Sequence, residues 1–146
     1  MIAVDTNILV YAHRRESREH NAAASLLHAL AEGDTPWAIP WPCCYEFLSV
    51  ATNRRLWSGN QSSADQAWEQ LSAWAASPVA RLIGETDGFL ATLERFARRP
   101  RVTGGVVHDA RIAAICVAHG VEALLTRDRD FSLFPELRTR DPLERA

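Results

Sequence analysis

The chain has 146 residues, of which 47% are hydrophobic and 23% charged, and its formal net charge is −2. These values are typical of one soluble globular domain, and they provide no positive field of the kind that indicates a nucleic-acid-binding protein. All 16 basic residues are arginine, and the absence of lysine excludes P-loop nucleotide hydrolysis and Schiff-base catalysis, because both need a lysine side chain. We therefore expect residues 1–146 to form a single domain whose chemistry does not depend on lysine.

The cysteines and the apolar segments indicate a cytoplasmic protein. Cys43 and Cys44 are adjacent, which is not the spacing of a zinc site, and Cys116 falls in an apolar helical pattern typical of a core residue. An odd and sparse set of cysteines fits a reducing compartment. Asp5 interrupts the N-terminal apolar run, and no apolar run reaches the ~18 residues of a membrane span. We expect neither a signal peptide nor a membrane contact.

Short apolar runs alternate with helical patterns along the whole chain. The first run ends at Asp5, which together with Thr6 is a candidate cap for the helix that follows. Gly33 marks the end of a second helix, and Thr86 or Asp87 is expected to cap a later one. The predicted elements, in chain order, are a strand at 2–5, a helix beginning at "NILVYA", a helix at 20–32, a strand at 37–40, a helix from Pro42 to about Asn53, a helix at 63–76, a strand at 79–84, a helix at 86–99, a helix at 104–120, a strand at 122–126 and a fifth strand near 137–141.

This alternation predicts the fold class. Strands that alternate with helices favour an α/β domain, in which a mainly parallel sheet of four to five strands forms the centre of a three-layer α/β/α sandwich. Open parallel sheets bind their ligands beyond the carboxyl ends of the strands. Polar residues that directly follow a predicted strand are therefore the first candidates for a functional site.

Asp5 and Glu46 are acidic residues that interrupt apolar patterns. Asp5 ends the first predicted strand, and burying a carboxylate there is costly unless something satisfies it. Glu46 shares a helical face with Cys43, Phe47 and Val50, one turn into the helix after the second strand. A glutamate favoured by the helix dipole is the alternative interpretation of Glu46.

Asp109 and Asp128 occupy comparable places in the second half of the chain. Asp109 aligns with the apolar residues of the helix at 104–120, although a role at the helix start is an alternative. Asp128 follows the strand at 122–126, and Asp130 has the same alternation, so either could be the fourth acid. Surface ion pairs with neighbouring arginines are the alternative for both.

Four acidic residues thus follow four different strand-to-helix transitions, which meet at one edge of a parallel sheet. At ~4 Å and an effective dielectric constant of ~20, each like-charge contact costs about 4 kcal/mol, and a divalent cation relieves this repulsion. Oxygen ligands without cysteine or histidine favour Mg²⁺ or Mn²⁺. The predicted ligands are Asp5, Glu46, Asp109 and Asp128, with Asn7 and Thr126 as neutral oxygens beside them.

Such a site is suited to hydrolysis of phosphodiester bonds, because the metal activates water and no nucleophilic side chain is needed. His108 is adjacent to Asp109 but points about 100° away on a helix, so we expect it at the periphery. Two alternatives stay open. A phosphatase with an aspartyl nucleophile would have a second acid where Asn7 stands, and a lysine. The second alternative is a non-catalytic module: either a receiver-like switch, which would also have a lysine, or a degraded nuclease that acts only by binding and does so independently of Mg²⁺.

Several segments resemble the PIN-domain ribonucleases, specifically the VapC toxins of bacterial toxin–antitoxin pairs. They are "VDTNILVYA", the glutamate of "YEFL", "HDARIAAICVAHGVEALLTRDRDF" and "FPELR", in the same order along nearly the whole chain. "TNRRLW" departs from the His-Pro expected in close relatives. The resemblance implies a PIN fold, with the acidic site of the family on Asp5, Glu46, Asp109 and Asp128, and the accompanying polar residues at Asn7 and Thr126.

The resemblance also implies an activity and partners. The activity is cleavage of RNA by an endonuclease that depends on Mg²⁺ or Mn²⁺. The protein partner is a small antitoxin that inserts a segment into the active-site groove, in a homodimer or a hetero-oligomer. The helix at 63–76, which has Trp68, Leu71 and Trp74 on one side, is a candidate contact surface.

Arginine clusters are candidate phosphate contacts for an RNA substrate. A solvated surface paired with nearby glutamates is the alternative. The clusters are Arg14, Arg15 and Arg18; Arg54 and Arg55; and Arg98, Arg99 and Arg101.

Overall fold

Five parallel strands form the centre of the fold, in the order β3-β2-β1-β4-β5. The computed structural model describes residues 1–144. The predicted α/β architecture with a parallel central sheet is confirmed, and the fifth strand is a short edge strand. The strands are β1 (Ile2–Val4), β2 (Trp37–Pro40), β3 (Ala80–Ile83), β4 (Ala123–Leu125) and β5 (Thr139–Arg140).

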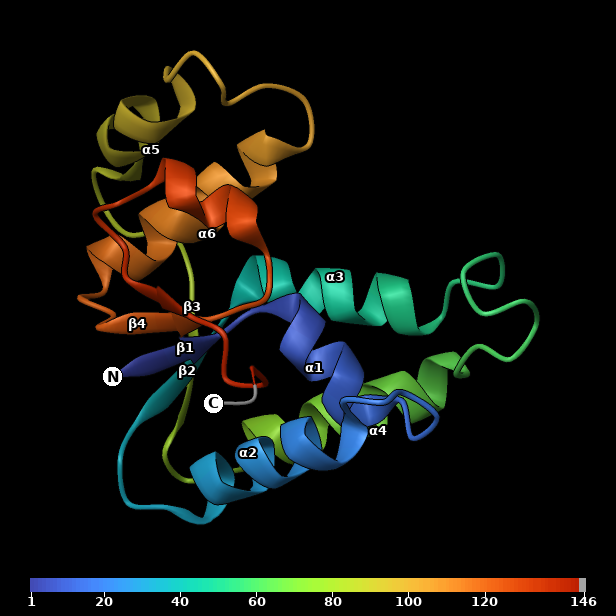
Figure 1. Ribbon diagram of the computed structural model, residues 1–146. Coiled ribbons are helices and arrows are strands. Elements are labelled where there is room, and N and C mark those ends of the chain that lie inside the picture. Colours follow the sequence, from blue (N-terminus) through green and yellow to red (C-terminus); the bar gives the residue numbers. More distant parts are fainter. Residues whose placement is uncertain (145–146) are drawn as a thin grey trace.

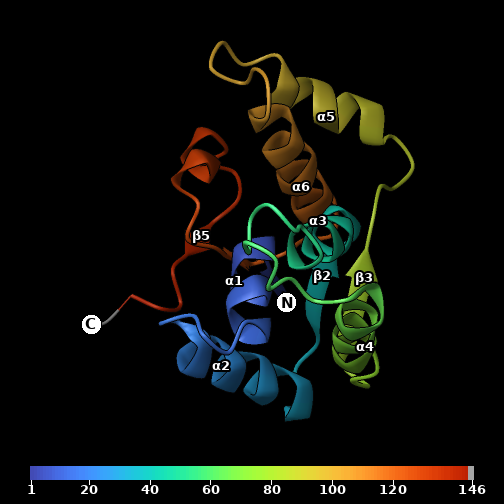
Figure 2. The same cartoon turned by 90° about the vertical axis from the view of Figure 1, so that its right-hand side faces the viewer.

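Helices cover both faces of this sheet. In Figure 1, α5 and α6 lie on one side and α1, α2 and α4 on the other, while α3 extends away from the carboxyl end of β2; Figure 2 shows the same layers turned by 90°. The helices are α1 (Thr6–His13), α2 (His20–Glu32), α3 (Trp41–Ala51), α4 (Ala64–Ala75), α5 (Phe89–Ala97), α6 (Val106–Ala118) and the 3₁₀ helix η1 (Arg129–Leu133).

β1 is the middle strand, and its position brings distant segments of the chain together. Ala3 lies opposite Ala38 of β2 and Leu124 of β4, and all three side chains are fully buried. Burial on both faces explains why these strands consist of continuous apolar residues rather than an alternating pattern. The backbone N–H of Asp5 donates to the carbonyl of Leu125 at 3.0 Å, so the ends of β1 and β4 are directly joined.

The start of α5 differs from the sequence-based expectation. The helix begins at Phe89, and the residue before it is Gly88, with φ of 77° and no side-chain cap. Neither Thr86 nor Asp87 is the cap, because the chain reverses through the left-handed conformation of Gly88, which glycine adopts without steric cost. Thr86 and Asp87 therefore indicate the turn before α5 correctly, but the helix begins later than the predicted residue 86.

The tryptophan-bearing helix α4 also differs from its prediction. Its first turn is closed by a capping box, in which the Ser63 hydroxyl accepts from the Gln66 N–H and the Gln66 side chain accepts from the Ser63 N–H. Leu71 and Trp74 are buried, but Trp68 is 60% exposed. The three residues therefore do not share one side, and Trp68 alone faces outward.

The core contains all three cysteines as free and buried thiols, which confirms the expectation for Cys116. Burial raises the pKa of the Cys116 thiol to about 12, so it stays protonated at neutral pH. Within residues 1–144, no helix has the length and apolar character needed to cross a membrane.

Candidate metal centre

Asp5 lies at the junction of β1 and α1, where its side chain is 5% exposed. Its Oδ1 accepts from the Thr6 N–H at 2.8 Å and from the Cys43 thiol at 3.5 Å, and its Oδ2 accepts from the Thr126 hydroxyl at 2.7 Å. Burial raises the pKa of Asp5, and these hydrogen bonds oppose that rise without cancelling it. The carboxylate in the apolar run is thus satisfied by neutral donors, with no arginine among the partners of Asp5 in residues 1–144.

Thr126 and Asn7 connect the acidic residues of the two strand ends. The buried Thr126 hydroxyl donates to Asp5, and it accepts from the Asp128 N–H at 2.9 Å and from the Asn7 side-chain amide at 3.2 Å. The Asn7 carbonyl oxygen accepts from the Arg127 N–H at 3.3 Å. These two neutral side chains hold Asp5 and Asp128 at one edge of the sheet.

Asp109 lies in the first turns of α6 and is partly buried. Burial is the main reason that its pKa is raised to about 7, and the negative charges of Asp128, Asp5, Asp130 and Glu46 add to the rise. The remainder of its helical face, including Ile112 and Cys116, is buried as the sequence predicts. Asp109 therefore retains its proton to a higher pH than an exposed aspartate does, and a cation that binds there would displace that proton.

Asp109, Asp128 and Asp130 form the tightest acidic group of the described residues. One carboxylate oxygen from each lies within 4.8 Å of the others. Asp128 caps η1, and its Oδ1 accepts from the Asp130 N–H at 2.9 Å. The structure therefore places both Asp128 and Asp130 beside Asp109, where the sequence left a choice between them.

Glu46 occupies a different position from the one its helical pattern predicts. Cys43 and Phe47 are fully buried, but Glu46 is exposed at the border of this face. Its Oε2 accepts from the Thr6 hydroxyl at 3.1 Å. The glutamate therefore reaches the cavity from the rim, because a position adjacent to Phe47 is turned about 100° from the buried stripe.

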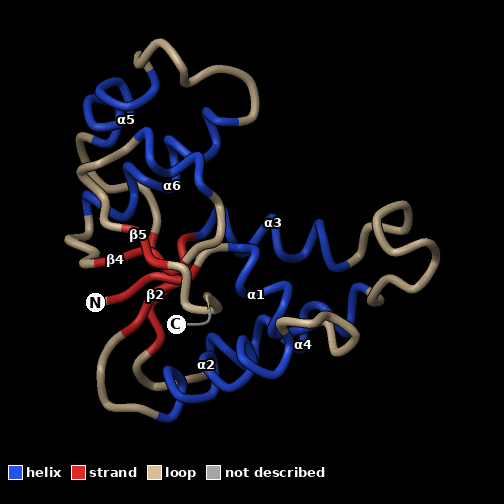
Figure 3. The backbone as a smooth tube through the Cα atoms, in the orientation of Figure 1, coloured by secondary structure: helices blue, strands red, loops and turns tan. Residues whose placement is uncertain are grey.

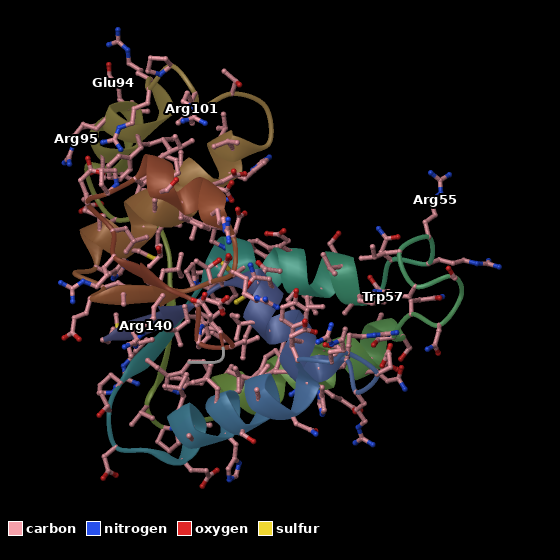
Figure 4. All side chains as sticks on the ribbon, in the orientation of Figure 1. Arg55, Trp57, Glu94, Arg95, Arg101 and Arg140 are labelled. Atoms are coloured by element: carbon pink, nitrogen blue, oxygen red, sulfur yellow. The ribbon has the colours of Figure 1, made fainter. Side chains whose placement is uncertain are left out.

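The predicted acidic residues line one cavity of about 310 Å³. Two of its lining residues, Leu56 and Trp57, were not predicted from the sequence and lie in the loop between α3 and α4. Figure 3 shows this loop joining the distal ends of the two helices, and in Figure 4 Arg55 points from it into solvent. Only the path of the loop brings these side chains to the site, and no local pattern signals it. The predicted residues at the cavity are Asp5, Asn7, Glu46, Asp109 and Asp128.

The arginine clusters are only partly available to a ligand. Arg14 is 7% exposed, its guanidinium lies 4.0 Å from the ring centroid of Trp57, and it donates to the carbonyl of Asn60 at 2.8 Å. Arg99 pairs with Glu136 and donates to a backbone carbonyl. For these two arginines the structure favours the alternative of internal contacts over phosphate contacts, because both attach loops to the core.

The remaining members of the clusters differ in environment. Arg98 forms an i,i+4 ion pair with Glu94. Exposed guanidinium groups are found at Arg15, Arg18, Arg54, Arg55 and Arg101.

Comparison with known proteins identifies the class to which this fold and acidic cavity belong. The PIN domain family matches residues 2–137, which include all the candidate site residues. Ribonuclease VapC43 of Mycobacterium tuberculosis is 35% identical over 99% of this chain and 97% of its own length, and Ribonuclease VapC48 of the same species is 31% identical over 94% of each. The chain belongs to the PIN-domain family, within its group of VapC ribonucleases.

Solved structures agree on the fold. VapBC2 from Rickettsia felis has a TM-score of 0.67 at 20% identity, covering 96% of this chain and 98% of that one. VapC20 of Mycobacterium tuberculosis, a toxin that cleaves the sarcin–ricin loop, has a TM-score of 0.66 at 20% identity, covering 90% and 93%.

Proposed function

We propose that this chain is a single-domain endoribonuclease that depends on Mg²⁺ or Mn²⁺ and acts as the toxin of a toxin–antitoxin pair. One observation carries the proposal: carboxylates from four separate segments line one cavity, in a chain that is 35% identical to a VapC ribonuclease. The proposed catalytic residues are Asp5, Glu46, Asp109 and Asp128.

The donor set fits a hard divalent cation. Carboxylate oxygens are the ligands that Mg²⁺ and Mn²⁺ prefer, and a cation here would offset both the burial and the neighbouring negative charges that together raise the pKa of Asp109. We assign Asp5 and Asp109 as direct ligands, while Glu46 and Asp128 orient water or hold a second ion. When bound, the ion supplies an activated water and neutralises charge that develops on the phosphate.

The chain itself supplies orientation. The Thr126 hydroxyl and the Thr6 N–H fix the two oxygens of Asp5, and the Thr6 hydroxyl fixes Glu46. Because these hydrogen bonds form in the folded chain, the carboxylates need little rearrangement when substrate arrives. A scissile phosphate at the cavity mouth meets a preorganised set of oxygens.

We propose a small antitoxin as the protein partner, in a dimer-based assembly, and the cytoplasm as the place of action on cellular RNA. VapBC2 of Rickettsia felis was solved bound to a DNA fragment from the promoter of its two components, which supports a two-component system. The exposed Trp68 on α4, beside a groove that includes Leu48 and Thr52, is our candidate contact for the partner.

The test compares RNA cleavage by wild type, Asp5→Asn and Asp34→Asn. Asp34 is an exposed loop residue outside the cavity and serves as the matched control. Asp5→Asn should abolish both cleavage and growth inhibition while its circular dichroism spectrum stays unchanged, and Asp34→Asn should retain both. Full cleavage by Asp5→Asn, or by wild type in excess EDTA, would refute the proposal.

A further inference from the structure

A second groove adjoins the acidic cavity. It has a volume of about 540 Å³ and lies between α3 and α6, where Tyr45, His108 and Arg111 line it. Glu46 and Asp109 line both this groove and the acidic cavity, so these two carboxylates stand between the two hollows. An extended polymer could therefore cross the carboxylates with its chain in both.

Tyr45 provides an exposed aromatic surface in this groove. Its ring stacks on that of Trp41, with centroids 6.0 Å apart and an interplanar angle of 27°. Trp41 packs closely against Gly84, where a Cβ would lie 3.1 Å from Trp41 Cδ1, so a larger residue would push against the indole. The Tyr45 side chain remains 60% exposed. The ring is thus supported by Trp41 and open to a further stacking partner.

We propose that an unpaired base of the RNA, next to the scissile phosphate, stacks on the ring of Tyr45. This inference rests on the proposed function for its choice of RNA. An unpaired base has a free face for an aromatic ring, whereas bases within a duplex are already stacked on both faces.

The groove also contains groups that suit a nucleic-acid backbone. Arg111 is held by Glu85, whose Oε1 accepts from the Arg111 Nε at 2.6 Å, and the Arg111 side chain stays 38% exposed. His108 is exposed beside it. Both side chains offer N–H donors to phosphate oxygens on the side of the carboxylates where Tyr45 lies.

Exposed aromatic residues are also enriched in protein interfaces. Continuity with the acidic cavity through Glu46 and Asp109 places the Tyr45 ring beside the carboxylates that the proposed function assigns to RNA cleavage, and this favours RNA. The experiment below separates the two.

The experiment measures RNA binding without cleavage, using the full chain in EDTA. The probe is a short unstructured oligoribonucleotide that contains 2-aminopurine, whose fluorescence is quenched when it stacks, and its affinity is measured by anisotropy of a fluorescein label. The variants are Tyr45→Ala, Tyr45→Phe and, as a control, Leu90→Ala, since Leu90 is an exposed apolar residue (80%) on α5. Sedimentation of each variant reports its oligomeric state.

Loss of one base–aromatic stack should weaken binding of Tyr45→Ala by about 5- to 100-fold, whereas Tyr45→Phe and Leu90→Ala should stay within about twofold of wild type. Wild type and Tyr45→Phe should quench 2-aminopurine, and Tyr45→Ala should not. The same strand annealed to its complement should bind without sensitivity to Tyr45→Ala.

Wild-type affinity or undiminished quenching in Tyr45→Ala overturns the inference. So does a loss of binding that accompanies a change in oligomeric state, because that result assigns Tyr45 to a protein interface. If binding depends on Tyr45 but the wild-type chain cleaves no RNA in Mg²⁺ or Mn²⁺, the proposed function fails while the stacking site stands.

Discussion

Asp109→Asn should stabilise the metal-free protein at alkaline pH. The pKa of Asp109 is raised from 3.8 to about 7, so between these values the folded chain retains a proton that the unfolded chain has released. The free energy of unfolding therefore falls as pH rises through this window. The electrostatic cost is absent below the unfolded pKa and complete above about pH 7. An asparagine has the same shape but never bears this charge.

The size of the effect follows from the pKa. A rise of about three pH units corresponds to about 4 kcal/mol at ~1.36 kcal/mol per unit, if solvent did not screen the charge. Asp109 is partly solvated, so we expect about 2 kcal/mol. For a chain of this size that is about 4–8 °C in Tm at about pH 8, and less than half of it at about pH 5.

Thermal unfolding of wild type and Asp109→Asn in EDTA, followed by circular dichroism at both pH values, measures this difference. Adding Mg²⁺ or Mn²⁺ should raise the Tm of the wild type and have little effect on the variant, because ligand binding stabilises the folded state by mass action. An equal Tm for the two proteins at about pH 8, or a gain that does not depend on pH, would refute the electrostatic argument.

Three further substitutions test interactions that stabilise the fold at and around the site. Thr126→Val removes the hydroxyl that donates to Asp5 at 2.7 Å, and it should lower the free energy of unfolding by about 1–3 kcal/mol in urea denaturation; a wild-type midpoint would contradict the network. Arg14→Ala removes the guanidinium that lies 4.0 Å from Trp57, so it should cost about 2 kcal/mol and shift tryptophan emission to the red, and an unchanged spectrum would show that the loop is held otherwise. Ser63→Ala removes the hydroxyl of the capping box and should cost about 1 kcal/mol in urea, with no effect on RNA binding.

The predicted strands and helices mostly agree with the structure because burial imposes a period that the residues display. β1 and β4 are continuous apolar runs, since each is covered on both faces. The errors fall at boundaries and faces. The cap predicted at Thr86 or Asp87 lies instead at Gly88, just before α5. Trp68 lies one position away from the buried stripe of α4.

The candidate acids were recognisable by the same reasoning. Asp5 breaks a buried run, and Asp109 lies in line with buried apolar residues, so each conflicts with its local pattern. Because parallel strands share one carboxyl edge, the order of elements was enough to predict that these acids meet. Their catalytic roles stay predictions.

Tertiary structure alone decided which side chains surround them. The loop after α3 brings Trp57 to the cavity, and Arg14 is buried beneath it instead of reaching a phosphate. Asp128 caps η1 with Asp130 in its first turn, and only the packing of this segment beside α6 brings both to Asp109. Periodicity reports which face of one element is buried, whereas the path of a loop and the partner of a charge depend on contacts between residues far apart in the chain.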